Sequence, residues 1–470
     1  MAARIATEPE LLPTFHSHRP SVRSHVTLAL CTVLHAFTHA YGTILVPLYL
    51  LMESDLRLRG VWQASLVVTV YGFVYCAFSY VAGVLADRSD RKVLLGVGLV
   101  GNAAAIALIG LVRQYELIVV LAVLAGLFGA LFHPCANALV SAHYPKSPGL
   151  AIGFLGIGAG IGFFVGPQYA GWRAQASGWH WGSIADWQRP LLEMGAAGLA
   201  AGIVFLFVAK EAEARKPVGW WGRRKGLNGN GNGNGRPAED ERGPSGAVAK
   251  KGRPLGPVLR KRVLAVAATL ACRDFAGVAS LTLASIYLQK AHGLDTRRAG
   301  FIVGAMMLIG VVINPLCVWV SPGRRRLPAL VTSLVVAALV VVTVPFWHVR
   351  HILWVLCAFQ ACHLGSYAIS DAALLERVSP DVRGRVVGLF LTVAGTFAST
   401  APWVMGFWTD ALGDAASQPR AYFGPFALVG TMMLLASTSA LFISRLGPPT
   451  GESPVGPMSE VTPATMEPVG

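Results

Sequence analysis

Charged residues are scarce in this sequence: only 13% of the 470 residues are charged, whereas about a quarter are in soluble proteins. Hydrophobic residues reach 54%. So little charge cannot cover the surface of a water-soluble globule, which excludes an ordinary soluble protein. We therefore expect an integral membrane protein that contacts the lipid bilayer.

Several functional motifs are also absent. The seven cysteines lie in apolar runs without the spacing of metal ligands, so we expect free thiols and no metal site. No G-x-x-x-x-G-K-[ST] loop is present, so any use of ATP would need a separate subunit. The net charge of +15 would suggest nucleic acid in a soluble protein, but no nucleic-acid motif accompanies it. The N-terminal region lacks the pattern of a cleavable signal peptide, and no cofactor is expected.

Apolar runs of about 20 residues, the length that spans a bilayer as a helix, recur along the chain. They are residues 26–51, 61–85, 93–112, 117–140, 149–170, 191–210, 263–289, 299–320, 327–346, 352–375, 386–409 and 422–443. The sequence therefore predicts an all-α integral membrane protein with twelve transmembrane helices.

A polar segment separates the sixth and seventh runs. It includes LNGNGNGNGRPAEDERGPSG, which has too little apolar content to fold. The predicted parts are an N-terminal tail (1–24), a first six-helix bundle (25–210), a flexible linker (211–262), a second six-helix bundle (263–446) and a disordered C-terminal tail (447–470). Lys and Arg concentrate in the linker and in loops on its side of the membrane. Both termini and the linker are therefore expected in the cytoplasm, and the chain in the inner (plasma) membrane.

The turn between the second and third runs, GVLADRSDRKVL at residues 83–94, carries most of the charge in that region. Such a turn must lie at a membrane face. We expect Gly83 to let two helices approach closely, and Asp87 to accept hydrogen bonds from the N-terminus of a neighbouring helix. The cations that would hold the turn on the cytoplasmic side are Arg88, Arg91 and Lys92.

This turn resembles the loop 2–3 signature of the major facilitator superfamily, roughly G-x-L-a-D-r-x-G-r-[RK]. The matching residues are Gly83, Leu85, Asp87, Arg88, Arg91 and Lys92. Asp90 stands where the family usually has glycine, which leaves the tightness of the turn open. The resemblance implies the major facilitator fold, with two six-helix bundles, and a role for this turn in conformational gating.

Ionisable residues inside membrane spans cost roughly 2.5–3.5 kcal/mol on insertion scales and are candidates for function. Here they fall in the first, fourth, seventh and tenth runs, which line the central cavity in the family that the chain resembles. The candidates for a substrate or proton pathway are His35, His39, His133, Arg273, Asp274, His363 and Asp371. For each of them, satisfied packing or an interhelical salt bridge is the alternative interpretation.

Neighbouring residues on a helix diverge by about 100°, so Arg273 and Asp274 are expected not to pair with each other. Arg273 is the best candidate for binding an anion or compensating a charge. Asp274 or Asp371 is predicted to carry a coupling proton. His35 and His39 share one helical face, and Pro134 is expected to kink the helix beside His133.

The fifth run contains GFLGIGAGIGFFVGP, in which small residues recur every four positions. The repeated residues are Gly158, Gly162 and Gly166, and Pro167 follows them. They predict a groove for a neighbouring helix and a bend. The pattern resembles the helix 5 signature of the superfamily's antiporters, which implies export by exchange; ordinary helix packing is the alternative.

A narrower resemblance, confined mainly to the first half, is to the fosmidomycin-resistance branch of bacterial drug exporters. The residues that carry it are His35, Pro47, Phe132, His133, Pro134, Gly166 and Pro167, with His39 where that branch tends to have an acid. It implies a drug exporter, but the substrate does not follow from it, and proton coupling through the first helix could differ where His39 replaces the acid. From all these patterns we expect a monomeric, proton-coupled exporter of a small organic compound, anionic or amphipathic, that works by alternating access. The alternatives are an uptake symporter or facilitator of the same fold, a membrane-embedded transferase, and a non-transporting sensor.

Overall fold

A computed structural model describes residues 21–176, 182–211, 256–378 and 383–447. Within these residues every regular element is a helix, and twelve helical spans are long and apolar enough to cross a membrane. The predicted all-α fold with twelve transmembrane helices is therefore confirmed. Most of the predicted linker and C-terminal tail, at 212–255 and 448–470, and residues 1–20 of the N-terminal tail lie outside the described residues.

Eight α-helices make the first six spans, because the first and fourth spans are each interrupted once. They are α1 (Val22–Thr43), α2 (Tyr49–Asp55), α3 (Val61–Arg88), α4 (Arg91–Ile109), α5 (Tyr115–Gly129), α6 (Phe132–His143), α7 (Pro148–Gln175) and α8 (Gln188–Val208). The interruptions lie near Pro47 and just before Pro134, because proline lacks an N–H and clashes with the preceding turn of a helix.

Nine α-helices make the last six spans, since the eighth, eleventh and twelfth spans each contain two. They are α9 (Pro257–Lys290), α10 (Thr296–Leu308), α11 (Gly310–Val320), α12 (Arg326–Thr343), α13 (Val349–Leu375), α14 (Arg383–Ala398), α15 (Ala401–Ala411), α16 (Phe423–Ser437) and α17 (Ser439–Ser444). The seventh span begins at Pro257, within the range predicted as linker. Proline at the start of a helix loses no hydrogen bond, which accounts for the earlier start.

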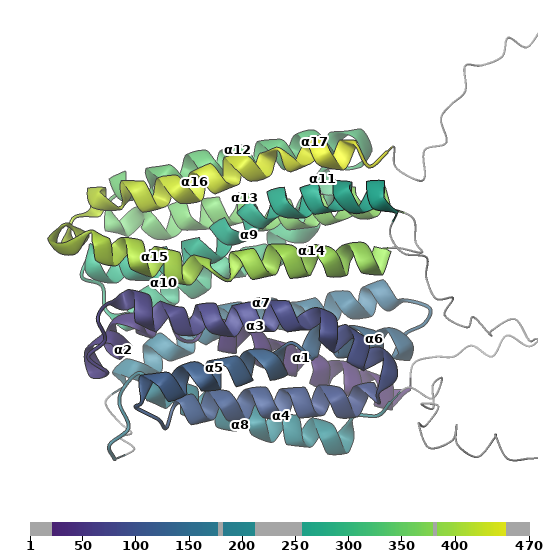
Figure 1. Cartoon of the computed structure of the whole chain (residues 1–470), viewed down its shortest axis with the longest axis horizontal. Coiled ribbons are helices and arrows are strands. Elements are labelled where there is room, and N and C mark those ends of the chain that lie inside the picture. The colour runs from purple at the N-terminus through teal and green to yellow at the C-terminus, as the bar shows by residue number, and fades with distance from the viewer. Residues whose placement is uncertain (1–20, 177–181, 212–255, 379–382, 448–470) are drawn as a thin grey trace, which may run out of the picture.

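The helices form two six-helix bundles that lie side by side (Figure 1). The first bundle, α1–α8, is drawn in purple to blue, and the second, α9–α17, in teal to yellow. The helices of both bundles run nearly parallel to the long axis of the molecule. This arrangement gives the protein two opposite ends at which short loops join successive spans.

The two bundles contact each other at the end that carries Gly60 and Asp410, which we call the closed end. There α7 of the first bundle packs against α10 of the second, and a Cβ atom added to Gly304 would lie 2.7 Å from the carbonyl oxygen of Phe164. Glycine at this position allows the two backbones to touch. Side chains at the closed end therefore separate any central space from the membrane face beyond them.

The bundles diverge toward the opposite end, where α1 begins and α17 ends, which we call the open end. Among the described residues, a Cβ atom on Gly83 of α3 or Gly388 of α14 would meet nothing within 4 Å. The same holds for Gly149, Gly153 and Gly156 on α7. The expectation that Gly83 allows close helix contact is therefore not met in this conformation, because the bundles have separated before they reach it.

Candidate functional site

The predicted ionisable residues gather into two clusters, one in each bundle. The histidine cluster of the first bundle consists of His35, His39 and His133. The ion cluster of the second bundle consists of Arg273, Asp274, His363 and Asp371. Within each cluster, residues up to about a hundred positions apart in the sequence lie close together in the fold.

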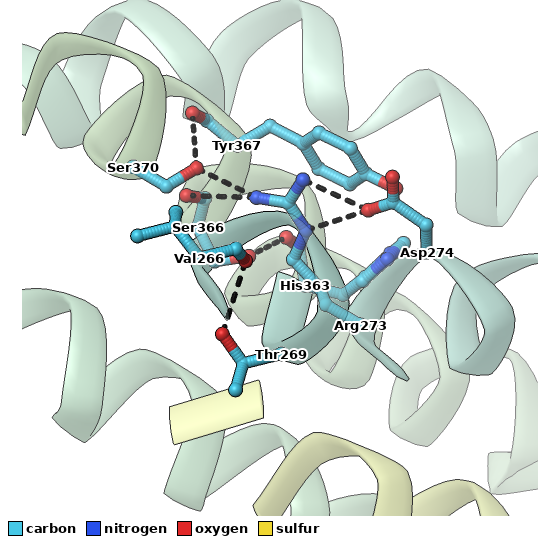
Figure 2. A network of polar contacts seen from close by, with 8 residues as sticks. All are labelled: Val266, Thr269, Arg273, Asp274, His363, Ser366, Tyr367 and Ser370. Carbon is cyan, nitrogen blue, oxygen red and sulfur yellow. Dashed lines mark hydrogen bonds and ion pairs between the residues drawn. The ribbon is translucent and has the colours of Figure 1, made fainter. Parts of the chain in front are cut away.

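The guanidinium of Arg273 is the centre of the ion cluster, and its side chain is completely buried. Its Nη1 atom donates a hydrogen bond to Ser370 Oγ at 2.7 Å and a longer one to the Ser366 carbonyl oxygen at 3.5 Å. The ring of Tyr367 covers one face of the guanidinium, with Arg273 Cζ 3.5 Å from the ring centroid (Figure 2). A buried cation is stabilised by such stacking and by hydrogen bonds to α13.

Asp274 is the ion-pair partner of Arg273, so the expectation that these neighbours cannot pair is wrong. Arg273 Nε and Nη2 each lie 2.8 Å from Asp274 Oδ1 (Figure 2). The Cα–Cβ bonds of adjacent helical residues do diverge, but the arginine side chain is long enough to turn back across the helix. Tyr367 and Ser370 hold it in that turned position. The pair is thus internally neutral.

Asp371 differs from Asp274 because its side chain is exposed and it follows Ser370 on α13. It lies within electrostatic range of Arg273. With Arg273 already neutralised by Asp274, the ion cluster as a whole carries one excess negative charge when Asp371 is ionised. An exposed carboxylate of this kind attracts a proton or another cation.

His363 contributes a hydrogen-bond acceptor to the same cluster. Its Nδ1 lies 2.8 Å from Gln360 Oε1, which can only accept, so Nδ1 carries the proton and Nε2 the lone pair. Among the described residues, no hydrogen-bond donor reaches the buried Nε2 atom. Gly277 makes room for the ring, since a Cβ atom there would collide with it. Within the described part of the chain, Nε2 is therefore an acceptor without a partner, packed against α9 at Gly277.

The histidine cluster is assembled by α1 and α6. His35 Nδ1 lies 2.7 Å from the Leu155 carbonyl oxygen on α7, and His35 Nε2 lies 2.9 Å from His39 Nε2. The His133 ring stands edge-on to the His35 ring, with 5.1 Å between centroids. Phe132 stacks on His35. The break before α6 that Pro134 causes is what turns His133 toward α1.

The glycine face of α7 lies directly against α1. Cβ atoms added to these glycines would meet carbonyl oxygens of α1, in the pairs Gly158 with Thr32, Gly162 with Ala36 and Gly166 with Ala40. Pro167 lies inside α7 without ending it. Close contact of the two backbones is what places the Leu155 carbonyl on His35.

The charged turn after α3 differs in detail from the expectation. Within the described part of the chain, Asp87 accepts no hydrogen bond from a helix N-terminus; its carboxylate is 80% exposed and lies 3.9 Å from Arg91 Nη2. Asp90 instead caps α4, because its Oδ1 accepts a hydrogen bond from Val93 N at 2.9 Å. Asp90, which replaces the usual glycine, thus caps α4, and the turn between α3 and α4 remains short.

A second partner of this turn comes from the end of the first bundle. Glu211, just beyond α8, accepts a hydrogen bond from Lys92 N at 2.9 Å. Burial at this site raises the pKa of the Glu211 carboxyl above its usual range. Arg88 is exposed at the end of α3. The turn is therefore tied to its own bundle in this conformation.

An ionic contact at the closed end was missed by the sequence reasoning. Asp410, on α15 of the second bundle, accepts a hydrogen bond from Trp62 N in the first turn of α3 at 2.8 Å. Lys290 Nζ lies 3.4 Å from the other carboxylate oxygen. A carboxylate of one bundle thus caps a helix of the other. The available signal was Gly60, which precedes α3 and has no side chain to cap it.

We expect Asp410→Asn to loosen the closed end. Asparagine can still accept from Trp62 N, but it loses the charge that strengthens this hydrogen bond and that pairs with Lys290. Charge assistance contributes about 1 kcal/mol, so the balance between closed and open ends should shift by roughly fivefold. The measurement is the distribution of distances between spin labels at the exposed positions Arg59 and Asp414 in a cysteine-free background. The variant should populate longer distances.

Asp295→Asn is the matched control for this prediction. Asp295 also caps a helix, accepting from Arg298 N at 2.7 Å, but that helix, α10, belongs to its own bundle. The label distances should therefore stay unchanged in this variant. Equal changes in both variants, or none in Asp410→Asn, would show that the contact between bundles does not hold the end closed.

Twelve apolar helices in two bundles, joined at one end and parted at the other around buried charges, define a multi-pass membrane transporter. A model of the Major Facilitator Superfamily matches residues 28–395. The chain belongs to this superfamily, which confirms the broadest of the resemblances found in the sequence.

Two curated proteins are similar in sequence to part of this chain. The multidrug resistance protein MdtG of Dickeya zeae (strain Ech586) is 33% identical over 147 residues, which cover 30% of this chain and 36% of the relative. The tetracenomycin C resistance and export protein of Streptomyces glaucescens is 35% identical over 136 residues, covering 29% and 24%. Each match thus spans well under half of the relative.

A solved structure shows the same fold over nearly the whole chain. It is a bacterial homolog of the human lysosomal transporter Spinster, crystallised in an inward-facing and unoccupied conformation. The TM-score is 0.74 at 15% sequence identity, and the match covers 91% of this chain and 98% of that structure. At this identity the likeness concerns the fold alone.

Proposed function

We propose that this chain is a secondary active transporter that exports a small amphipathic, cationic compound in exchange for protons by alternating access. The observation that carries the proposal is the exposed Asp371 beside an Arg273 that Asp274 already neutralises. Arg273 is buried, covered by Tyr367 and paired with Asp274, so it serves to compensate charge and does not bind an anionic substrate. The excess charge of the site is negative, which favours a cation.

Exchange follows from competition for one carboxylate. Ionised Asp371 attracts either a proton or the cationic group of a substrate, and a protonated Asp371 has no charge left to hold the substrate. Proton binding on one side of the membrane therefore favours substrate release there, and proton loss on the other side restores affinity.

The orientation of the chain in the membrane determines whether the open end faces the cytoplasm or the outside. The open end carries the cations of the turn after α3, namely Arg88, Arg91 and Lys92. Cytoplasmic loops carry an excess of such residues, so we assign the open end and both termini to the cytoplasm of a bacterial inner membrane. The conformation described is then inward-facing, and the turn from Gly83 to Lys92 would reorganise when the open end closes.

The direction of transport is supported by several resemblances. The relatives are named for multidrug resistance and for tetracenomycin C export, and the glycine helix and FHP motif resemble those of antiporters and of the fosmidomycin-resistance branch. We assign the chain a monomeric transport role without a cofactor, and not an enzymatic one. The ionisable residues lie within the two bundles and do not gather at one membrane face, as a transferase site would.

The runner-up is uptake of an anionic metabolite together with a proton, and the buried Arg273 is the observation that favours it. A proton on Asp274 would free the guanidinium for the anion, so proton and anion would bind together and move in the same direction. The charge of the substrate and the direction of flux therefore change together between the two proposals.

The test is growth of an efflux-deficient bacterium that expresses the chain, on a panel of cationic antimicrobials, organic acids and phosphonates. We expect resistance to a subset of amphipathic cations, lost on adding an uncoupler. Asp371→Asn should lower resistance to that of the empty vector, because the variant cannot exchange a proton for a cation. Glu116→Gln, which neutralises an exposed acid at the start of α5, is the matched control and should stay resistant.

Two results would overturn the proposal. Full resistance in Asp371→Asn would show that this carboxylate does not couple transport to protons. Selective sensitisation to organic acids or phosphonates by the unmodified chain would show import of anions, as the runner-up predicts. Everted vesicles provide the direct check, since adding an exported cation should release protons from vesicles that contain the unmodified chain only.

A further inference from the structure

The histidine cluster of the first bundle has no role in the exchange step above. Each of its three imidazoles offers one ring nitrogen, and these nitrogens all lie within 4.8 Å of one another. Two of the rings, His35 and His39, come from one face of α1, and His133 comes from the broken fourth span. Three convergent imidazoles from two helices form the ligand set of a metal site that keeps an open position.

The hydrogen bonding of His35 fixes which of its nitrogens could bind a metal. The Leu155 carbonyl oxygen can only accept, so Nδ1 at 2.7 Å carries the proton and Nε2 carries the lone pair. Histidines that ligate metals almost always donate their other N–H to a carbonyl or carboxylate in this way. The glycine face of α7 makes that bond possible, because it brings the Leu155 carbonyl close to α1.

The surroundings hold the rings in place while leaving the ligands neutral. Phe132 stacks on His35 with 4.7 Å between centroids, and the Phe163 ring lies 4.5 Å from that of His39. His35 is only 5% exposed, whereas His39 and His133 are partly accessible. A dication bound by three neutral ligands keeps its full charge in a low-dielectric site, so binding should be exchangeable and not permanent.

The chemistry of the ligands selects the class of cation. Imidazole suits zinc, copper, nickel and cobalt, whereas magnesium and calcium need oxygen ligands. Zinc–nitrogen bonds of about 2.0–2.1 Å require the three nitrogens to be roughly 3.4 Å apart. The Nε2 atoms of His35 and His39, 2.9 Å apart and hydrogen-bonded to each other, would have to separate slightly, and the His133 ring would have to move toward them. Side-chain rotation supplies such a movement.

We propose that His35, His39 and His133 form a binding site for a divalent transition-metal cation of the zinc class, with one coordination position left open. Cysteine spacing alone predicted no metal site. The histidine site is not apparent in the sequence because His133 lies far along the chain from His35 and His39. The proposal is independent of the exported compound, since metal binding is measured without flux.

The experiment uses the full chain, purified in detergent with an affinity tag that contains no histidine. Cobalt(II) is the probe, because its visible absorption reports coordination by imidazoles; Zn²⁺ and Mg²⁺ are added as competitors. We expect about one Co²⁺ per chain, displaced by Zn²⁺ and not by Mg²⁺. His39→Asn and His133→Asn should each weaken binding by at least tenfold to a hundredfold, since even second-layer changes have effects of about that size.

His25→Asn is the matched control, since His25 lies on the same helix α1 but is exposed and outside the cluster. It should bind Co²⁺ like the unmodified chain. Thermal unfolding and gel filtration establish that each variant is folded, and Zn²⁺ should raise the melting temperature of the unmodified chain but not of His133→Asn. No cobalt absorption band, a band that survives both cluster variants, or equal competition by Mg²⁺ would overturn the proposal.

Discussion

Arg273→Ala is expected to abolish transport and to destabilise the second bundle strongly. Removing one member of a buried ion pair costs roughly 3–5 kcal/mol, because the remaining charge is left without compensation. Here Asp274, only 14% exposed, would lose both of its contacts to the guanidinium, and Tyr367 would lose the cation that its ring covers. The measurements are thermal unfolding in detergent and proton-driven export in vesicles.

Two companion variants separate charge from geometry. Arg273→Lys keeps the positive charge but has no planar fork to reach Asp274 and Ser370 together, so we expect a folded protein whose transport falls about tenfold or more. The double variant Arg273→Met with Asp274→Asn removes both charges, and neutral replacement of a buried pair is often tolerated. It should recover much of the stability without recovering transport.

The outcomes distinguish a structural salt bridge from a functional one. If the double variant regains transport together with stability, the pair only holds α9 against α13. If Arg273→Ala is as stable as the unmodified chain, the ion pair described by the structure does not form in the membrane. Loss of transport in a stable double variant would place the charge pair in the transport cycle.

Gly162→Ala is expected to destabilise the first bundle strongly. Its Cβ atom would collide with the Ala36 carbonyl oxygen, which belongs to the backbone of α1 and cannot rotate away. Overpacking of this kind costs roughly 1–3 kcal/mol, and here it would also shift α1 and with it the histidine cluster. The expected results are a lower melting temperature and a lower yield of monodisperse protein.

Gly156→Ala on the same helix is the control for this prediction. Among the described residues, nothing lies within 4 Å of the Cβ atom that it would add, and alanine favours a helix over glycine by about 1 kcal/mol. Its melting temperature should be equal to or higher than that of the unmodified chain. Similar losses in both variants would mean that glycine content, and not the contact with α1, determines the stability of α7.

The membrane spans could be predicted from the sequence because lipid imposes a simple rule of length and polarity on each helix separately. Every predicted run corresponds to an observed span, and the largest differences lie at ends such as Pro257, where local capping decides where the helix begins. Helix ends depend on a few hydrogen bonds, to which hydropathy is insensitive.

The candidate site was predictable only in part, since individual residues stand out by their charge but their partners do not. Arg273 and Asp274 were identified as costly in a membrane, yet their pairing depends on how Tyr367 holds the guanidinium. Glu193 was overlooked inside the sixth run, although it pairs with Arg173 at 2.7 Å. Convergence of His133 on α1 depends on a helix break whose direction the sequence does not reveal.

Three glycines of α7 lie at the open end, where the fold should tolerate substitution. They are Gly149, Gly153 and Gly156. Because a Cβ atom at these positions would touch nothing among the described residues, a small side chain there should leave folding and expression intact. In an alternating mechanism the same positions would come together when the open end closes. Variants at them would therefore change the rate of transport while the amount of folded protein in the membrane stays the same.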